Sequence, residues 1–273
     1  MAISMIFVRK YTMLLNPLSR WLYLIALIFI TSVKIQCQNI AETDNIQPFN
    51  QIKLMGNVSI VCEVDTLNPC TIEYPNSSID IKKQFFITLK NQILTIQLLD
   101  NSLHTDYDTV KPIKIRVPSL KGLENSYDST LYIVGNVNTS TLKIRQYGNG
   151  RIIIIDSITA SKIETKILAG KGTIQIGSIN AEDLSCNIVG KGSISIRDGF
   201  VSNLKCNTIG TAKLYLRGLK TDSVHIKYCG GGSIDFGINK DLYACGVGST
   251  KISFLGQPQI KRKGSAKPQQ IIN

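Results

Sequence analysis

Histidine is nearly absent from this sequence, in which His104 and His225 are the only two among 273 residues. Histidine-containing metal sites and nucleophile-histidine-acid triads need imidazole groups close to their partners, and two distant histidines match neither pattern. The glycine-rich stretches also lack the spacing and the Lys-Ser/Thr end of a phosphate-binding loop. We therefore expect no metal site, no cofactor and no enzymatic activity of these classes.

Amphipathic helices are also missing from the pattern, because no segment has a sustained apolar stripe with a 3.6-residue period. Between residues 48 and 118, apolar and polar residues instead alternate in short runs, at 52–54, 58–64, 85–89, 93–99 and 113–117. Alternation with a period of two is typical of half-buried strands. The sequence therefore predicts an all-β chain whose N-terminal part, residues 39–130, is rich in strands.

Residues 1–38 have the pattern of an export signal. Arg9, Lys10 and Arg20 precede an apolar run at 21–33, which is shorter than the roughly 20 residues that a bilayer-spanning helix needs. We interpret the segment as a cleaved signal peptide, with an uncleaved N-terminal anchor as the alternative. Either form places the protein outside the cytoplasm, secreted or at the cell surface, and membrane contact is expected only through this segment if it stays uncleaved.

Charge is unequal, with 31 Lys and Arg against 19 Asp and Glu and a net charge of +12. The last acidic residue is Asp241, and the basic residues that follow it in the C-terminal stretch include Lys261, Arg262, Lys263 and Lys267. We interpret residues 258–273 as a solvated basic tail or last rung, with contact to a polyanion or phosphate surface as the alternative. Nucleic acid is not an expected partner, because the chain carries an export signal and no recognition motif.

A glycine-led phrase recurs in the second half of the chain. The pattern Gly-x-Gly-polar-apolar-x-apolar, with departures such as "GTAK" and "GSTK", begins at Gly148, Gly170, Gly190, Gly210, Gly230 and Gly248. The spacing is close to twenty residues, which is the length of a structural repeat. Glycine suits a corner where the backbone has a positive φ or where close approach excludes a Cβ atom.

The apolar residues of the repeats form columns. The phrase itself supplies two columns: the first is Ile152, Ile174, Ile194, Leu214, Ile234 and Ile252, and the second is Ile154, Ile176, Ile196, Leu216, Phe236 and Phe254. A column near the middle of each repeat consists of Ile158, Ile179, Phe200, Leu219 and Ile238, and a later one consists of Ile163, Leu184, Leu204, Val224 and Leu242. Because the two columns of the phrase belong to one short run, the columns mark three apolar stations per repeat. Three such stations describe one coil of a β-solenoid, which buries them only when neighbouring coils stack. Residues 131–257 are therefore predicted to form about six parallel coils.

Six cysteines remain when Cys37, at the edge of the signal, is set aside, and an even number in an oxidising compartment favours disulfides. Cys186 and Cys206 stand at the same position of adjacent repeats, so we pair them. Cys229 and Cys245 are offset by two residues and need a diagonal pairing, and Cys62 could pair locally with Cys70. Free buried thiols are the alternative for all six.

Three Asn-x-Ser/Thr triplets, at Asn57, Asn76 and Asn138, are candidate glycosylation sites in a eukaryotic source. Enzymes with a β-helix fold use clustered carboxylates as catalytic groups. Asp183, Asp198, Asp222, Asp235 and Asp241 are the candidates. Turn capping accounts for such aspartates without catalysis, and the isolated Asp235 does not make an acid/base pair.

The stretch "GKGTIQIGSINAEDLSCNIVGKGSISI", its "AEDL" turn, the earlier "IKIRVPSLKGLE" and the closing "FLGQPQIKRKGSAK" resemble the auto-transporter adhesin head domain, the GIN domain, a domain of unknown function. The resemblance covers about Phe49 to Lys267. It implies a right-handed parallel β-helix or related β-solenoid that is exported and often surface-associated, and it brings no enzymatic residues. The cysteines, "GTAK" and "GSTK" depart from the family pattern.

Three functions fit these features. The first is a non-catalytic adhesin-like module that presents a stacked β face to a glycan or a surface protein, through the outward column Gln175, Ser195, Tyr215 and Asp235. The second is a structural surface protein without a specific ligand. The third, a polysaccharide-active enzyme, is disfavoured because the carboxylates do not cluster. A contiguous polar or aromatic strip on one sheet would favour the first function over the second.

Overall fold

The computed structural model describes residues 42–74, 85–99 and 112–271. Residues 41–273 form one compact unit, and its buried core extends from Phe49 to Ala266. The predicted export signal at 1–38, the triplet at Asn76 and His104 lie outside the described residues. The elements of the described residues are all strands, and these residues include no helix with the length and apolar character needed to cross a membrane.

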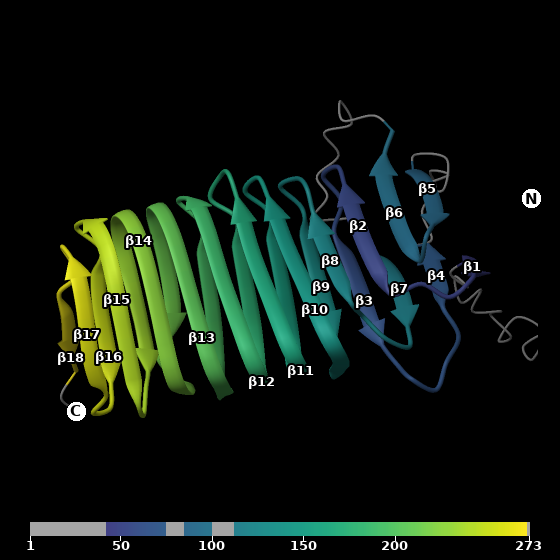
Figure 1. Cartoon of the computed structure of the whole chain (residues 1–273). Coiled ribbons are helices and arrows are strands. Elements are labelled where there is room, and N and C mark those ends of the chain that lie inside the picture. The colour runs from purple at the N-terminus through teal and green to yellow at the C-terminus, as the bar shows by residue number, and fades with distance from the viewer. Residues whose placement is uncertain (1–41, 75–84, 100–111, 272–273) are drawn as a thin grey trace, which may run out of the picture. The chain divides into compact units, whose positions relative to one another are not determined.

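The repeat half is a stack of parallel coils, which confirms the predicted β-solenoid, and the whole stack has about seven turns. The strands of the repeat half are β10 (Val137–Tyr147), β11 (Arg151–Leu168), β12 (Thr173–Gly190), β13 (Ser193–Leu216), β14 (Leu219–Gly237), β15 (Asp241–Gly248) and β16 (Lys251–Leu255). The longest of them bend round corners, so that one strand serves more than one face of the stack (Figure 1). Each long strand pairs in parallel with the strands of the coils on either side.

The predicted apolar columns face the core in register. Ile152 pairs with Ile174 and Ile174 with Ile194, and further along Leu214 pairs with Ile234 and Ile234 with Ile252. All of these side chains are buried. Burial of one such side chain is worth about 1.5–3 kcal/mol, so the column is a main source of the stability that holds one coil on the next.

The mid-repeat column differs from the prediction at one position. Gly199, not Phe200, stacks between Ile179 and Leu219, and Phe200 points outward beside Asn180. Gly199 has a φ of 129°, and a Cβ atom built on it would lie 2.0 Å from the Ile179 carbonyl oxygen. The backbone approaches so closely here that only glycine fits, and the bulky residue is displaced to the surface.

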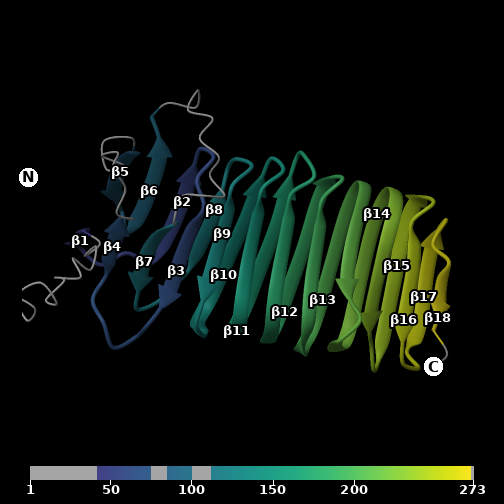
Figure 2. The ribbon, with the colours of Figure 1, turned by 180° about the vertical axis from the view of Figure 1, so that it is seen from behind.

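The N-terminal strands join the same stack but not in chain order. The coil of β2 (Gln51–Met55) and β3 (Ile60–Val64) lies between two others, one made by β6 (Ile93–Leu98) and β7 (Ile113–Val117), the other by β8 (Gly122–Asn125) and β9 (Thr130–Val134). The pairs β8–β10 and β9–β11 then continue into the repeats. The solenoid therefore extends through the strand-rich part on the N-terminal side of residue 131 (Figure 2).

Antiparallel pairs occur at the N-terminal end of the stack. β1 (Glu42–Asn45) pairs with β4 (Thr71–Tyr74), β4 pairs with β7, and β5 (Phe85–Lys90) pairs with β6. These added strands cover the end coil, which would otherwise expose strand edges and core residues. A solenoid needs such a cap because its terminal coil lacks a neighbour on one side.

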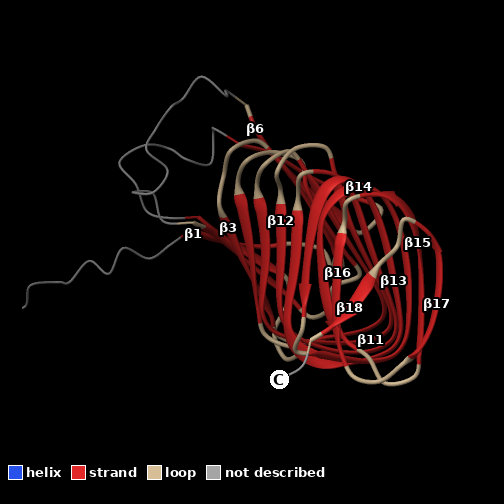
Figure 3. Cartoon of the chain, turned by 90° about the vertical axis from the view of Figure 1, so that its left-hand side faces the viewer, coloured by secondary structure: helices blue, strands red, loops and turns tan. Residues whose placement is uncertain are grey.

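The other end is closed by the basic C-terminal stretch. β17 (Gln259–Gly264) runs parallel to β15, and β18 (Pro268–Gln270) runs parallel to β16. Figure 3 looks onto this end of the stack. The basic stretch thus adds a solvent-exposed rung to the stack, which fixes Lys261 and Lys263 in register with Tyr243 and Cys245.

Candidate functional site

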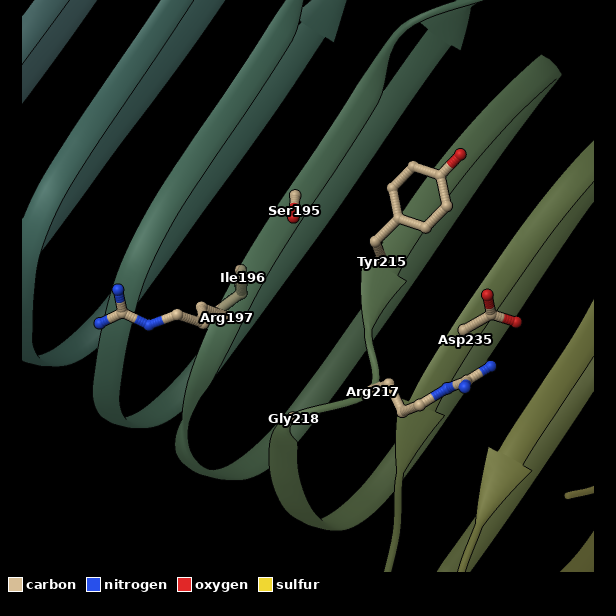
Figure 4. Close-up of a pocket in the computed structure, with 7 residues that line it drawn as sticks. All are labelled: Ser195, Ile196, Arg197, Tyr215, Arg217, Gly218 and Asp235. Atoms are coloured by element: carbon tan, nitrogen blue, oxygen red, sulfur yellow. The ribbon is translucent and has the colours of Figure 1, made fainter. Parts of the chain in front are cut away.

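An open groove of about 440 Å³ crosses the outer surface of β13 and β14. It is lined by residues from three successive coils, Ser195, Ile196, Arg197, Tyr215, Arg217, Gly218 and Asp235. Figure 4 shows these side chains on the outer surface of neighbouring rungs. The groove is therefore a product of stacking, because no single coil contains it.

Strand alternation places the polar side chains of the groove outside. Ile194 and Ile196 point into the core, so Ser195 between them points out. The same alternation turns out Tyr215 and Asp235, which are direct register partners. The predicted outward column is thus present as a physical row across the coils.

Aromatic and charged groups meet in this groove. The Tyr215 side chain is 44% exposed, and in Figure 4 the Arg217 side chain extends toward the strand that carries Asp235. Neither Arg217 nor Asp235 forms an ion pair with any residue that the structure describes. Both groups can therefore bind a ligand without breaking an existing bridge.

Arg197 is held differently. Its Nε donates a hydrogen bond of 3.0 Å to Asp198 Oδ2, and its side chain extends away from Arg217 in Figure 4. Hydrogen bonds from Ser178 and Arg197 hold the pKa of Asp198 below its usual range. Arg197 therefore borders the groove as part of a surface ion pair.

Three of the four predicted ligand-face residues come together in the groove, namely Ser195, Tyr215 and Asp235. The fourth, Gln175, pairs with Ser195 on the next rung and does not line the groove. The sequence interpretation missed Arg197 and Arg217. A signal was available for Arg197, which follows Ser195 by two positions within β13 and so shares its face, whereas Arg217 lies in the turn just beyond the end of β13 at Leu216.

The candidate carboxylates do not gather into an acid/base pair. Asp183 accepts a hydrogen bond from Asn203, and Asp222 is bound by Lys240 and Asn239. Asp241 lies exposed on another part of the surface, in register with Ser223 and Gln259. No three His, Cys, Asp or Glu side chains within 42–74, 85–99 and 112–271 are placed to hold a metal ion.

The four cysteines of the repeats lie in the register that the sequence predicts, but no disulfide joins any of the six in the structure. Cys186 and Cys206 are direct register partners and both are buried, as the repeat predicts. Cys229 pairs with Val247 and Cys245 with Lys227, which is the expected two-residue offset. All six, Cys62 and Cys70 included, are nevertheless free thiols in this structure; the disulfides remain a proposal that the register supports.

The remaining predicted residues lie on the surface. Asn57 and Asn138 are exposed, as a glycan acceptor must be. His225 is half-buried on the outer wall of the coil, where its ring lies 4.5 Å from that of Tyr243. Burial, together with the ammonium groups of Lys227 and Lys205, lowers its pKa.

Stacked coils define the class of protein as a β-solenoid, and a polar groove crosses its outer surface. The model of the family described as "Putative auto-transporter adhesin, head GIN domain" matches residues 48–258. The chain belongs to this family, as the resemblance in its sequence predicted.

Solved structures share the fold at low identity. A "putative adhesin" from Parabacteroides merdae has 19% identity and a TM-score of 0.77 over 85% of this chain and 95% of its own. A "putative adhesin" from Parabacteroides distasonis has 17% identity and a TM-score of 0.76, over 85% and 96%. A "putative lipid binding protein" from the same species has 20% identity and a TM-score of 0.71, over 85% and 96%. No curated protein matches the chain.

Proposed function

We propose that this protein is an exported, non-catalytic adhesin-like module that binds a glycan across the groove of β13 and β14. The observation that carries the proposal is the exposed ring of Tyr215, which lies in one row with Ser195 and Asp235. A tyrosine ring can stack on the apolar face of a sugar while its hydroxyl stays in water. Arg217 and Asp235 supply a donor and an acceptor for sugar hydroxyls.

The membership of an adhesin family supports a binding role. The geometry supports an extended ligand, because equivalent outward positions recur on each coil, roughly 4.8 Å apart. The groove is open, so that each contact is weak on its own. We expect useful affinity to come from several sugar units along the coils or from several copies on one surface.

Binding of purified residues 39–273 to a glycan and matrix-protein array, at low and raised salt, tests this function. We expect saturable binding to a narrow class of glycans that survives raised salt. Tyr215→Ala should weaken it by at least about tenfold, on the order of the stacking energy of one ring. The matched control is Tyr127→Ala, since Tyr127 has a similar exposure of 39% but lies away from the groove.

Equal binding by the Tyr215 and Tyr127 variants would contradict the groove as the site. Binding only to matrix proteins would keep the adhesin-like role and replace the ligand class. Absence of any salt-resistant binding would favour the second function, a structural surface protein whose stacked ladders serve durability.

A further inference from the structure

A second face of the solenoid carries a cluster of lysines that only the coil register brings together. One outward column runs across four coils as Lys205, His225, Tyr243 and Lys261. The neighbouring column, two residues further along each strand, runs as Asn207, Lys227, Cys245 and Lys263. We call Lys205, Lys227, Lys261 and Lys263 the basic face.

The four lysines of the basic face lie close together, and no described acidic side chain forms an ion pair with them. With rungs roughly 4.8 Å apart and alternate residues roughly 7 Å apart, its four ammonium groups share an area of roughly 15 by 7 Å. None of the four forms an ion pair with a residue in the described part of the chain. Asp241, the exposed acid closest in register, stands one column further out, beside Ser223 and Gln259.

An apolar ladder runs along the other side of these columns. It consists of the outward residues just before the glycine corners, Leu168, Val189, Ile209, Cys229 and Val247, each in register with the next. Val189 is 42%, Ile209 56% and Val247 70% exposed. A continuous row of exposed apolar side chains marks a contact surface rather than chance exposure.

Lysines also stand on the far side of the ladder. Lys171 and Lys191 directly follow the corner glycines Gly170 and Gly190 and are exposed. The ladder therefore has exposed lysines beyond its first rungs and the basic face beside its later rungs, and Tyr243 lies one column away, beyond Cys245. Apolar side chains flanked by lysine and tyrosine are the composition that proteins present to the boundary between lipid headgroups and acyl chains.

We propose that the basic face and the apolar ladder together form a peripheral binding surface for membranes that contain anionic lipids. The lysines would contact the headgroups while Ile209 and Val247 enter the boundary beneath them. This site is separate from the proposed glycan groove, and it adds a membrane contact beyond the N-terminal segment that the sequence suggested.

Other occupants explain less of this surface. A soluble polyanion would use the lysines but would leave the exposed apolar ladder without a role. A second copy would cover the ladder but would bring two basic faces together, which is unfavourable for a chain with a net charge of +12. An anionic membrane satisfies the charges and the apolar row at once.

Co-sedimentation of residues 39–273 with lipid vesicles tests the proposal. This form contains the whole compact unit and omits the apolar N-terminal run, which could bind lipid by itself. Vesicles of phosphatidylcholine with about 30% phosphatidylglycerol would be compared with phosphatidylcholine alone, at about 0.1 M and 0.5 M salt. We expect binding to the anionic vesicles that raised salt weakens but does not abolish.

Three variants separate the contributions. The charge variant Lys205→Gln/Lys227→Gln/Lys261→Gln/Lys263→Gln should lower the vesicle partition coefficient by at least about tenfold. Its control, Lys114→Gln/Lys213→Gln/Lys220→Gln/Lys251→Gln, removes four exposed lysines from other positions and should bind like the wild type. The apolar variant Ile209→Thr/Val247→Thr should lose the salt-resistant part of the binding.

Several results would overturn the proposal. The first is equal loss in the charge variant and its control, with unfolding midpoints unchanged. The second is unchanged binding by the apolar variant at both salt concentrations together with full competition by dextran sulfate, which would assign the face to soluble polyanions. The third is a dimer that the apolar variant dissociates, which would assign the ladder to a second copy. Loss of glycan binding in Tyr215→Ala with intact vesicle binding would show that the membrane surface and the glycan groove bind independently.

Discussion

The repeat coils and the N-terminal coils build the same stack from different sequence patterns. In the repeats, strands such as β12 and β13 are long, and identical or similar residues meet in register at almost every step. In the N-terminal coils the strands are short, the β2–β3 coil is inserted between later ones, and antiparallel strands close the end. Stacking coils therefore need matching inward residues, but they do not need a repeated phrase.

Core truncation should separate the two regions most strongly. Ile194 is fully buried with a parallel coil on either side, whereas the equally buried Ile96 has β2 on one side and the antiparallel β5 on the other. Ile194→Ala should lower the free energy of unfolding by about 4 kcal/mol, and Ile96→Ala by about 2 kcal/mol, because the end coil can relax into the cavity. Urea unfolding of both variants checks this order, and an equal or reversed loss would contradict it.

Corner glycines should matter in both regions, whether or not the phrase is present. Gly230 has a φ of 127° and a built Cβ atom would lie 2.3 Å from the Gly210 carbonyl oxygen. Gly230→Ala should therefore cost about 3 kcal/mol of unfolding free energy. Gly135, with a φ of 97° and a contact of 2.6 Å to the Val64 carbonyl oxygen, should cost a similar amount in the N-terminal coils.

Gly231 is the matched control for this prediction. It follows Gly230 directly, has no positive φ, and its built Cβ atom meets nothing closer than 3.4 Å. Gly231→Ala should change the free energy of unfolding by less than about 1 kcal/mol in either direction. A large loss at Gly231, or none at Gly230, would contradict the close-approach explanation.

The smallest expected difference between the two regions is in the reactivity of their individual cysteine thiols. Burial, with smaller contributions from Glu63 and Cys70, raises the pKa of Cys62 in the N-terminal coils. Hydrogen bonding to Cys206 lowers the pKa of Cys186, and the same bond raises that of Cys206. At neutral pH the exposed Cys229 should react with maleimide first, and Cys62 only after unfolding.

Oxidation of the thiols tests whether the register of the repeat coils selects one disulfide. Because Cys186 and Cys206 face each other on adjacent rungs, a disulfide oxidant such as oxidised glutathione should convert the two thiols into one disulfide and leave two reduced glutathiones. Closing this loop should stabilise the fold by about 3 kcal/mol or less. Peptide mapping under non-reducing conditions checks the pairing, and a predominant Cys229–Cys245 or Cys62–Cys70 product would show that register alone does not select it.

Much of the candidate site could be anticipated from alternation. Since Ile194, Leu214 and Ile234 had to point inward, the residues after them had to point outward, and Ser195, Tyr215 and Asp235 do so. Phe200 shows the limit of the method, because its apolar character suggested the core while the close backbone approach at Gly199 required a residue without Cβ. Hydrophobicity identifies what favours burial but not where a chain has room for a side chain.

The sequence by itself determined the all-β solenoid, the register of the repeats and the family, because each of these depends on residues that recur at a fixed spacing. The tertiary structure alone decided the order of the N-terminal coils, the groove across three coils and the alignment of Lys261 and Lys263 with Lys205 and Lys227. These features depend on contacts between residues far apart along the chain. Local pattern does not encode such contacts, which form only when whole coils bury their apolar faces against one another.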